Sequence, residues 1–183
     1  MAYYFFDFRN EAKRDLRGLL SSLLLQLSAQ SDACHGVLSR LYSTYDNGSR
    51  LPDDGMLLRC LKDMLELAHN PPIYFIVDAL DECPNTFGLP YPYERVLEFI
   101  EDLVESHVPN LRVCATSRPE IDIQNVLEPL ASHTVSLPDQ NGQKQDINDY
   151  IISVVHSDRR MRKWSADDKE LVIDTLSERA DGM

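Results

Sequence analysis

Residues 73–77 constrain the fold more than any other stretch, because they are five consecutive apolar residues between a double proline and the acid Asp78. A run of this length with these flanks favours a buried strand of a parallel sheet over a helix. Open α/β sheets bind their ligands at the carboxyl ends of the strands. Asp78 is therefore expected at the edge of the sheet where a functional site would form.

The rest of the chain alternates between strand and helix patterns. Residues 3–8 and 111–116 are further predicted strands, residues 133–137 a last one, and residues 139–142 a loop. Amphipathic helices are predicted at 10–30, 37–42, 53–68 and 93–107, around Val126 and Leu127, at 146–155 and at 165–180. This alternation predicts an α/β fold with a mostly parallel sheet. Because strand character begins almost at the first residue, we also expect a segment upstream of it.

Charge and apolar content narrow the classes of partner. A net charge of −12 argues against a sequence-independent grip on nucleic acid, which requires neutralising Lys and Arg side chains. One basic stretch, DRRMRK at 158–163, fits either a solvated helix face or a contact with phosphate or a partner. No apolar run reaches the roughly 18 residues of a membrane span, and the four cysteines have neither C-x-x-C nor zinc spacing. We therefore expect a cytoplasmic protein without membrane contact.

Two more acids, Asp81 and Glu82, follow Asp78 on the same predicted loop. A carboxylate at this edge can hold Mg²⁺, which bridges nucleotide phosphates, and a second carboxylate can orient or activate the attacking water. The small side chain of Ala79 leaves room for phosphates beside the first acid. The alternative interpretation is that acids at a strand end only cap or solvate the loop.

The next predicted strand, 111–116, also ends in polar residues: Thr116, Ser117 and Arg118. Parallel strands place this end at the same edge as Asp78, where a hydroxyl and a guanidinium can sense or clamp a γ-phosphate. Taken alone, Arg118 would be interpreted as an ordinary surface arginine. Its position one helix after the Asp78 strand favours the phosphate contact.

These motifs resemble those of a known family. IYFIVDALDECPN and LRVCATSRPEIDI are similar to the Walker B and sensor 1 strands of NACHT-type STAND NTPases, especially fungal ones with a nephrocystin-like N-terminal NTPase domain. The stretch YYFFDFRNEAKRDLRGLLSSLLLQLS resembles the segment after the family's P-loop helix, and DINDYI and SERADGM resemble motifs near the end of its core. The resemblance extends over essentially all 183 residues and implies a P-loop NTPase-like three-layer sandwich.

The resemblance also implies roles for the residues that match. Asp78 would coordinate Mg²⁺, Asp81 and Glu82 would be catalytic or would orient water, and Thr116, Ser117 and Arg118 would contact the phosphates of ATP or GTP. Residues 1–156 would form the NTPase core after the P-loop, with Walker B at 73–82 and sensor 1 at 111–118. Residues 157–183 would begin a helical extension.

The chain departs from the family in one respect. A phosphate loop needs G-x-x-x-x-G-K-[ST], and none of the seven glycines here is followed by Lys. The phosphate cradle, the lysine and the Mg²⁺-binding hydroxyl are therefore not encoded in these 183 residues. In the family, the missing strand would lie between 111–116 and 133–137.

A complete family member would be a nucleotide-dependent signalling switch. The resemblance implies effector domains and ankyrin or WD40 repeats in the same polypeptide, and a homo-oligomeric state. Two other classes remain open: a protein-interaction module that no longer binds nucleotide, and a Mg²⁺-dependent phosphohydrolase with Asp78 as nucleophile. The second fits less well, because such enzymes present D-x-D soon after the first strand, whereas D-x-x-D-E lies mid-chain here.

Overall fold

The computed structural model describes residues 1–67, 72–84, 92–136 and 141–179, without the side chains of residues 141–144. The chain divides into two compact units, Met1–Ala131 and Ser132–Met183, which are described separately. The predicted boundary between core and helical extension, after residue 156, lies within the second unit. None of the helices in the described ranges has the length and apolar character to cross a membrane.

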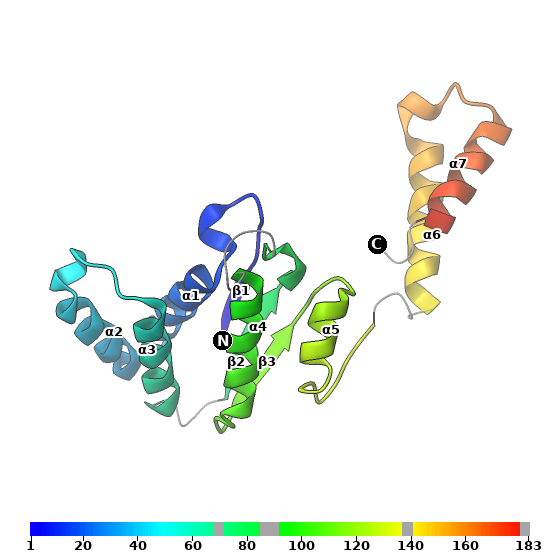
Figure 1. Cartoon of the computed structure of the whole chain (residues 1–183). Helices are drawn as coiled ribbons and strands as arrows, with labels where there is room; N and C mark the ends of the chain where they lie inside the picture. Colours follow the sequence, from blue (N-terminus) through cyan, green and yellow to red (C-terminus); the bar gives the residue numbers. More distant parts are fainter. Residues whose placement is uncertain (68–71, 85–91, 137–140, 180–183) are drawn as a thin grey trace. The chain divides into compact units, whose positions relative to one another are not determined.

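The first unit is built on a three-stranded parallel sheet in the order β1-β2-β3 (Figure 1). The strands are β1 (Ala2–Phe5), β2 (Ile73–Asp78) and β3 (Leu111–Ala115). In the register, Tyr4 lies opposite Val77 and Phe75 lies opposite Val113. The predicted fold class, a layered α/β fold with a parallel sheet, is confirmed.

Helices connect the strands as the apolar periodicity predicts. Between β1 and β2 lie a 3₁₀ turn (Glu11–Lys13), α1 (Leu16–Ser28), α2 (Asp32–Thr44), a second 3₁₀ turn (Asp46–Gly48) and α3 (Asp54–Leu67). A third 3₁₀ turn (Leu80–Glu82) and α4 (Pro92–Glu105) connect β2 to β3, and α5 (Ile121–Leu127) follows β3. Both crossovers join neighbouring parallel strands, and right-handed crossovers in one direction place their helices on the same face of the sheet.

That face holds the core, because alternate strand residues point toward α1 and α4. Phe75 and Val77 of β2 are 1% and 2% exposed, and Tyr4 of β1 is buried beside them. They share one apolar cluster with buried side chains of the helices, among them Leu19, Leu20, Leu23, Leu61, Met64, Val96 and Ile100. Burial of large aliphatic and aromatic side chains in this cluster is the main force that holds the helices on the sheet.

The start of α1 lies very close to β1. The Asp15 carboxylate caps the helix by accepting a hydrogen bond from the Gly18 N–H at 2.8 Å. A β-carbon at Gly18 would lie 2.3 Å from the Ala12 carbonyl oxygen and 2.5 Å from the Tyr4 hydroxyl. Glycine at this position therefore allows the helix to approach the strand. Burial, with Asp15 nearby, raises the pKa of the Tyr4 hydroxyl, which donates to the Ala12 carbonyl.

In the described part of the first unit, the opposite face of the sheet is largely bare. Tyr3, Phe5 and Tyr74 on this face are 47%, 49% and 49% exposed, although they are large and aromatic. An open hollow on the same face is lined by Met1 and by residues of β2 and β3: Tyr74, Phe75, Ile76, Arg112, Val113 and Cys114. Parallel sheets are normally covered on both faces, so this surface is unusual for its class.

The second unit is a helical hairpin. It consists of α6 (Asn141–Ser157), a 3₁₀ turn (Arg159–Met161) and α7 (Ala166–Arg179). Val155 is buried within the hairpin, and the Ser177 hydroxyl donates a hydrogen bond to the Asn148 side chain at 2.9 Å. A capping box begins α7, since the Asp168 N–H donates to the Ser165 hydroxyl at 3.1 Å and the Ser165 N–H donates to the Asp168 carboxylate at 3.4 Å.

Two predictions for the region after α5 are wrong. Residues 133–136 form no strand; they are irregular and exposed, and Leu137 lies outside the described residues. Among the described residues, β3 is therefore an edge strand and nothing pairs with its outer side. The predicted loop at 139–142 also differs, because Asn141 and Gly142 already belong to α6, while residues 139 and 140 are not described.

Candidate functional site

The carboxyl ends of β2 and β3 meet through a hydrogen-bonded pair, Asp78 and Thr116. The Thr116 hydroxyl donates to the Asp78 carboxylate and accepts a hydrogen bond from the Ala79 N–H at 3.1 Å. The Thr116 N–H donates to the Val77 carbonyl, which continues the strand pairing to this point. Because the sheet is parallel, two residues 38 positions apart in sequence lie side by side at its edge.

The backbone turns sharply immediately after Asp78. Ala79 has φ 57° and ψ 51°, a left-handed conformation that a residue with a β-carbon adopts at a cost of about 1–3 kcal/mol. Asp81 and Glu82 follow in the 3₁₀ turn, and the Leu80 N–H donates to the Thr116 carbonyl. The turn therefore keeps the acidic loop against the end of β3.

Asp81 joins this loop to Arg118. Its carboxylate accepts a hydrogen bond from the Arg118 N–H at 3.0 Å and pairs with the Arg118 guanidinium at 3.4 Å. The Asp81 side chain is 11% exposed, whereas that of Arg118 is 71% exposed. Ser117 is also engaged, since its hydroxyl donates to the Arg118 carbonyl. Asp81 thus fixes the position of an arginine whose guanidinium remains largely in solvent.

Glu82 points to a different partner. Its carboxylate accepts a hydrogen bond from the Phe8 N–H at 3.4 Å. Phe8 belongs to the segment that follows β1, and the Phe6 N–H donates to the Asp78 carbonyl, so this segment emerges at the same edge of the sheet. The structure therefore separates the two acids that the sequence treats alike: Asp81 lies against the β3 loop and Glu82 against the β1 loop.

Arg9 is a cation at this edge that sequence reasoning missed. It pairs with Asp7 at 3.0 Å and lies over the Phe8 ring, 5.7 Å from its centre. Hydrogen bonding to Asp7 and the nearby charge of Glu82 raise the pKa of the Arg9 guanidinium, and the Arg9 partner lowers the pKa of Asp7. The sequence predicts a strand at 3–8, whereas β1 ends at Phe5, so residues 7–9 already belong to the segment that follows the strand at the carboxyl edge of the sheet.

Two buried groups lie beneath the acidic loop. Burial and then the charges of Asp122, Glu120 and Asp81 raise the pKa of the Tyr93 hydroxyl to about 12. Burial and then the charge of Asp15 raise the pKa of the Cys83 thiol to about 12, and this thiol contacts the Arg14 carbonyl. Both groups therefore remain neutral near pH 7.

The donor set is compatible with a magnesium ion that keeps several of its waters. No group of three or more His, Cys, Asp or Glu side chains in the described part of the chain could enclose a metal. Mg²⁺, however, commonly keeps several waters and binds one or two carboxylates together with substrate phosphates. Asp78 fits as the single carboxylate ligand, with the Thr116 hydroxyl orienting it.

A comparison with models of protein families identifies the family of the chain. Residues 1–118 match the model of the nephrocystin 3 N-terminal family, which is well over half of the 183 residues. The chain belongs to the nephrocystin 3 N-terminal family. The matched part begins at β1 and ends at Arg118, so it includes every candidate site residue named above. No curated protein and no solved structure matches the chain significantly.

Membership of the nephrocystin 3 N-terminal family confirms the nephrocystin-like part of the resemblance. The narrower NACHT and STAND assignment, the Walker B and sensor 1 roles, and the resemblance of residues 119–183 stay predictions.

Proposed function

We propose that the first unit is the nucleotide-binding part of a NACHT-type STAND switch and that its site is the carboxyl edge of the sheet. The observation that carries this proposal is the Asp78–Thr116 pair, with Arg118 held beside it by Asp81. An acid, a hydroxyl and a solvent-facing guanidinium at one edge of a parallel sheet form a suitable set for Mg²⁺ and phosphate oxygens.

In this proposal each residue has a distinct task. Asp78 holds Mg²⁺ and Thr116 keeps its carboxylate in place. Arg118 contacts the γ-phosphate, and Ser117 supports the loop that carries it. Asp81 positions Arg118, which refines the catalytic role expected from the sequence. Glu82 orients or deprotonates the attacking water, and its bond to the Phe8 N–H fixes one of its two oxygens.

The proposal includes partners that the residues of this chain do not identify. The nucleotide is ATP or GTP, and effector and repeat domains, ankyrin or WD40, belong to the same polypeptide. Nucleotide binding would shift the protein between a closed state and a homo-oligomer. Such a shift requires that the nucleotide bind one state more tightly than the other.

The 183-residue chain alone is expected to bind Mg·ATP and Mg·GTP weakly. The backbone N–H groups and the lysine of a phosphate loop provide most of the anchoring in such sites, and the chain encodes no such loop. Calorimetric titration of the chain should therefore give no dissociation constant below about 1 µM, which corresponds to about −8 kcal/mol. A sub-micromolar value would contradict this account and would indicate a second, different nucleotide site.

The bare face of the sheet favours a second candidate function, a protein-interaction module. Tyr3, Phe5 and Tyr74 expose aromatic surface of the kind that marks contact sites. Two results together would identify the chain as a protein-interaction module. It would fail to bind nucleotide even with a phosphate loop supplied upstream, and it would still bind a partner through this face.

A further inference from the structure

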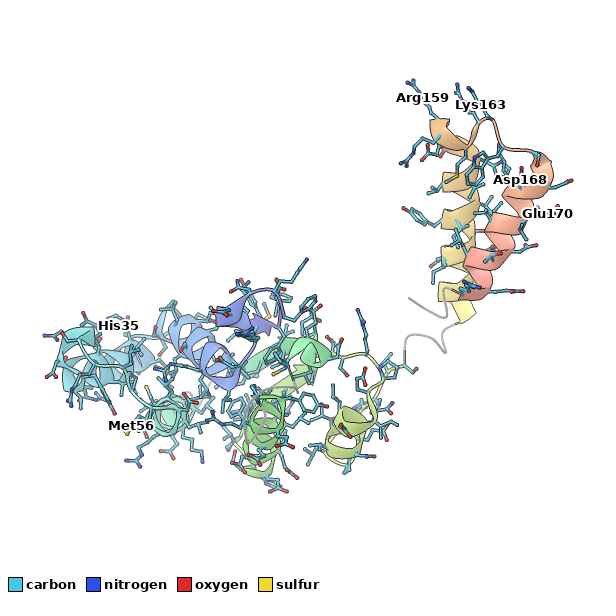
Figure 2. The ribbon with its side chains drawn as sticks, turned by 45° about the horizontal axis from the view of Figure 1, so that its top comes forward. His35, Met56, Arg159, Lys163, Asp168 and Glu170 are labelled. Carbon is cyan, nitrogen blue, oxygen red and sulfur yellow. The ribbon has the colours of Figure 1, made fainter. Side chains whose placement is uncertain are left out.

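The hairpin of the second unit carries a concentrated positive charge at its turn. Arg159, Arg162 and Lys163 are exposed there, and Trp164 beside them is 41% exposed. We call these four residues the basic tip. Figure 2 shows Arg159 and Lys163 at the end of the hairpin, pointing away from it. A neighbouring cation, Arg160, is already neutralised by Asp158 at 2.7 Å.

The three cations of the basic tip make no ion pair within the described residues of their own unit. Asp168 and Glu170, which Figure 2 labels, lie on α7, and Asp168 is occupied by the Ser165 cap. Arg and Trp are the residues most enriched in the energetic centres of protein interfaces. The tip therefore combines unneutralised charge with a half-exposed aromatic side chain.

A complementary surface exists on the first unit. Glu98, Glu101, Asp102 and Glu105 lie on the outer side of α4 at helical spacing and are all exposed. We call these residues the acidic ridge. Like charges three or four residues apart on a helix repel and destabilise it slightly. No ion pair to these four acids is found in the described parts of the chain, so a cationic partner would relieve the repulsion.

We propose that the basic tip of one copy of this chain binds the acidic ridge of α4 in a second copy. The contact joins two different surfaces, so each copy presents one free tip and one free ridge. Association of this head-to-tail kind forms rings or open chains, depending on whether the rotation closes. Trp164 would be covered at the centre of the contact while the three cations face the acids around it.

The small number of cations in the basic tip favours a protein partner over a phosphate polymer. A protein that holds nucleic acid without sequence preference neutralises many phosphates with Lys and Arg, whereas the tip offers three cations in a chain whose net charge is −12. The ridge is a local acidic surface that needs only three or four cations to balance it. A short basic tip is therefore better matched to the ridge than to an extended anionic surface.

Trp164 gives a direct readout, because it is the only tryptophan in the chain. With the 183-residue chain at about 0.1 M salt, we expect sedimentation to show concentration-dependent association. Over the same concentrations Trp164 emission should shift to the blue and acrylamide should quench it less. Raising the salt to about 1 M shortens the Debye length from about 10 Å to about 3 Å, and the dissociation constant should rise at least about tenfold.

Charge reversal tests which surfaces take part. The tip variant carries Arg159→Glu, Arg162→Glu and Lys163→Glu, and the ridge variant carries Glu98→Lys, Glu101→Lys and Glu105→Lys. Each variant alone should be monomeric, while an equimolar mixture should associate again. A matched control changes the net charge by the same amount as the tip variant, at exposed positions of α2 and α3: Arg40→Glu, Arg59→Glu and Lys62→Glu. This control should associate like the parent. Circular dichroism must show that all proteins are folded.

Three results would overturn the proposal. If the tip variant associates as strongly as the parent, the contact lies on another surface, such as the bare sheet face. Association through that apolar face would persist at high salt. A mixture that stays monomeric, with both variants folded, would show that tip and ridge do not meet. Covering of Trp164 that is independent of concentration would mean that the tip is occupied within its own chain.

Discussion

Replacing Glu82 with glutamine is expected to slow nucleotide hydrolysis by about 10²- to 10⁴-fold with little change in nucleotide affinity. The measurement requires a polypeptide that carries a phosphate loop ahead of residue 1. Glutamine keeps an oxygen that can accept the Phe8 N–H, so the loop after β1 keeps its contact. What is lost is the carboxylate that can take a proton from the attacking water. Single-turnover hydrolysis and equilibrium binding, measured on the same preparation, separate the two effects.

Glu66→Gln is a suitable control, because Glu66 is an exposed acid on α3 outside the site. It should hydrolyse nucleotide at the parent rate. If Glu82→Gln also does so, Glu82 is not the general base. If instead affinity falls as much as the rate, Glu82 belongs to the binding of nucleotide rather than to the chemical step.

Replacing Phe75 with alanine is expected to lower the free energy of unfolding of the first unit by about 3–5 kcal/mol. Phe75 is 1% exposed at the centre of the middle strand, so its loss leaves a cavity between the sheet and the helices. The free energy of unfolding of a native domain is only about 5–15 kcal/mol, so a loss of about 3–5 kcal/mol is a large share of it. Urea unfolding followed by circular dichroism measures the change, since Trp164 belongs to the second unit.

Tyr74→Ala is the matched control from the adjacent position of the same strand. Tyr74 points to the bare face and is 49% exposed, so its truncation should cost less than about 1 kcal/mol. Equal destabilisation by the two changes would mean that the second face is also packed, and that the assignment of the core to one face is wrong.

The sequence predicts most of the secondary structure because apolar periodicity and turn residues are local signals. Residues 73–77 are an apolar run with clear flanks, residues 111–115 are apolar except for Arg112, and both are strands. A weaker pattern predicts a strand at 133–137, but a strand also needs a pairing partner, and residues 133–136 pair with none of the described strands. Pairing partners are non-local, so a local pattern cannot supply them.

The sequence also predicts one part of the candidate site and misses another. The meeting of Asp78 with Thr116 follows from the topology, since parallel strands bring their carboxyl ends together. The separate partners of Asp81 and Glu82 do not follow from it. They depend on the left-handed turn at Ala79, which rotates successive residues toward different loops. Alanine gives no advance sign of such a conformation, unlike glycine or asparagine.

Calorimetric titration with Mg·ATP tests the central claim, that the edge around Asp78 is a Mg²⁺-nucleotide site, most directly. The proteins compared are the polypeptide with an upstream phosphate loop, its Asp78→Asn variant, and Asp63→Asn as an exposed control on α3. We predict affinity that requires Mg²⁺, is kept in the control and falls at least about tenfold in Asp78→Asn, as expected for a lost metal contact. Equal affinity in all three proteins, with or without Mg²⁺, would contradict the account.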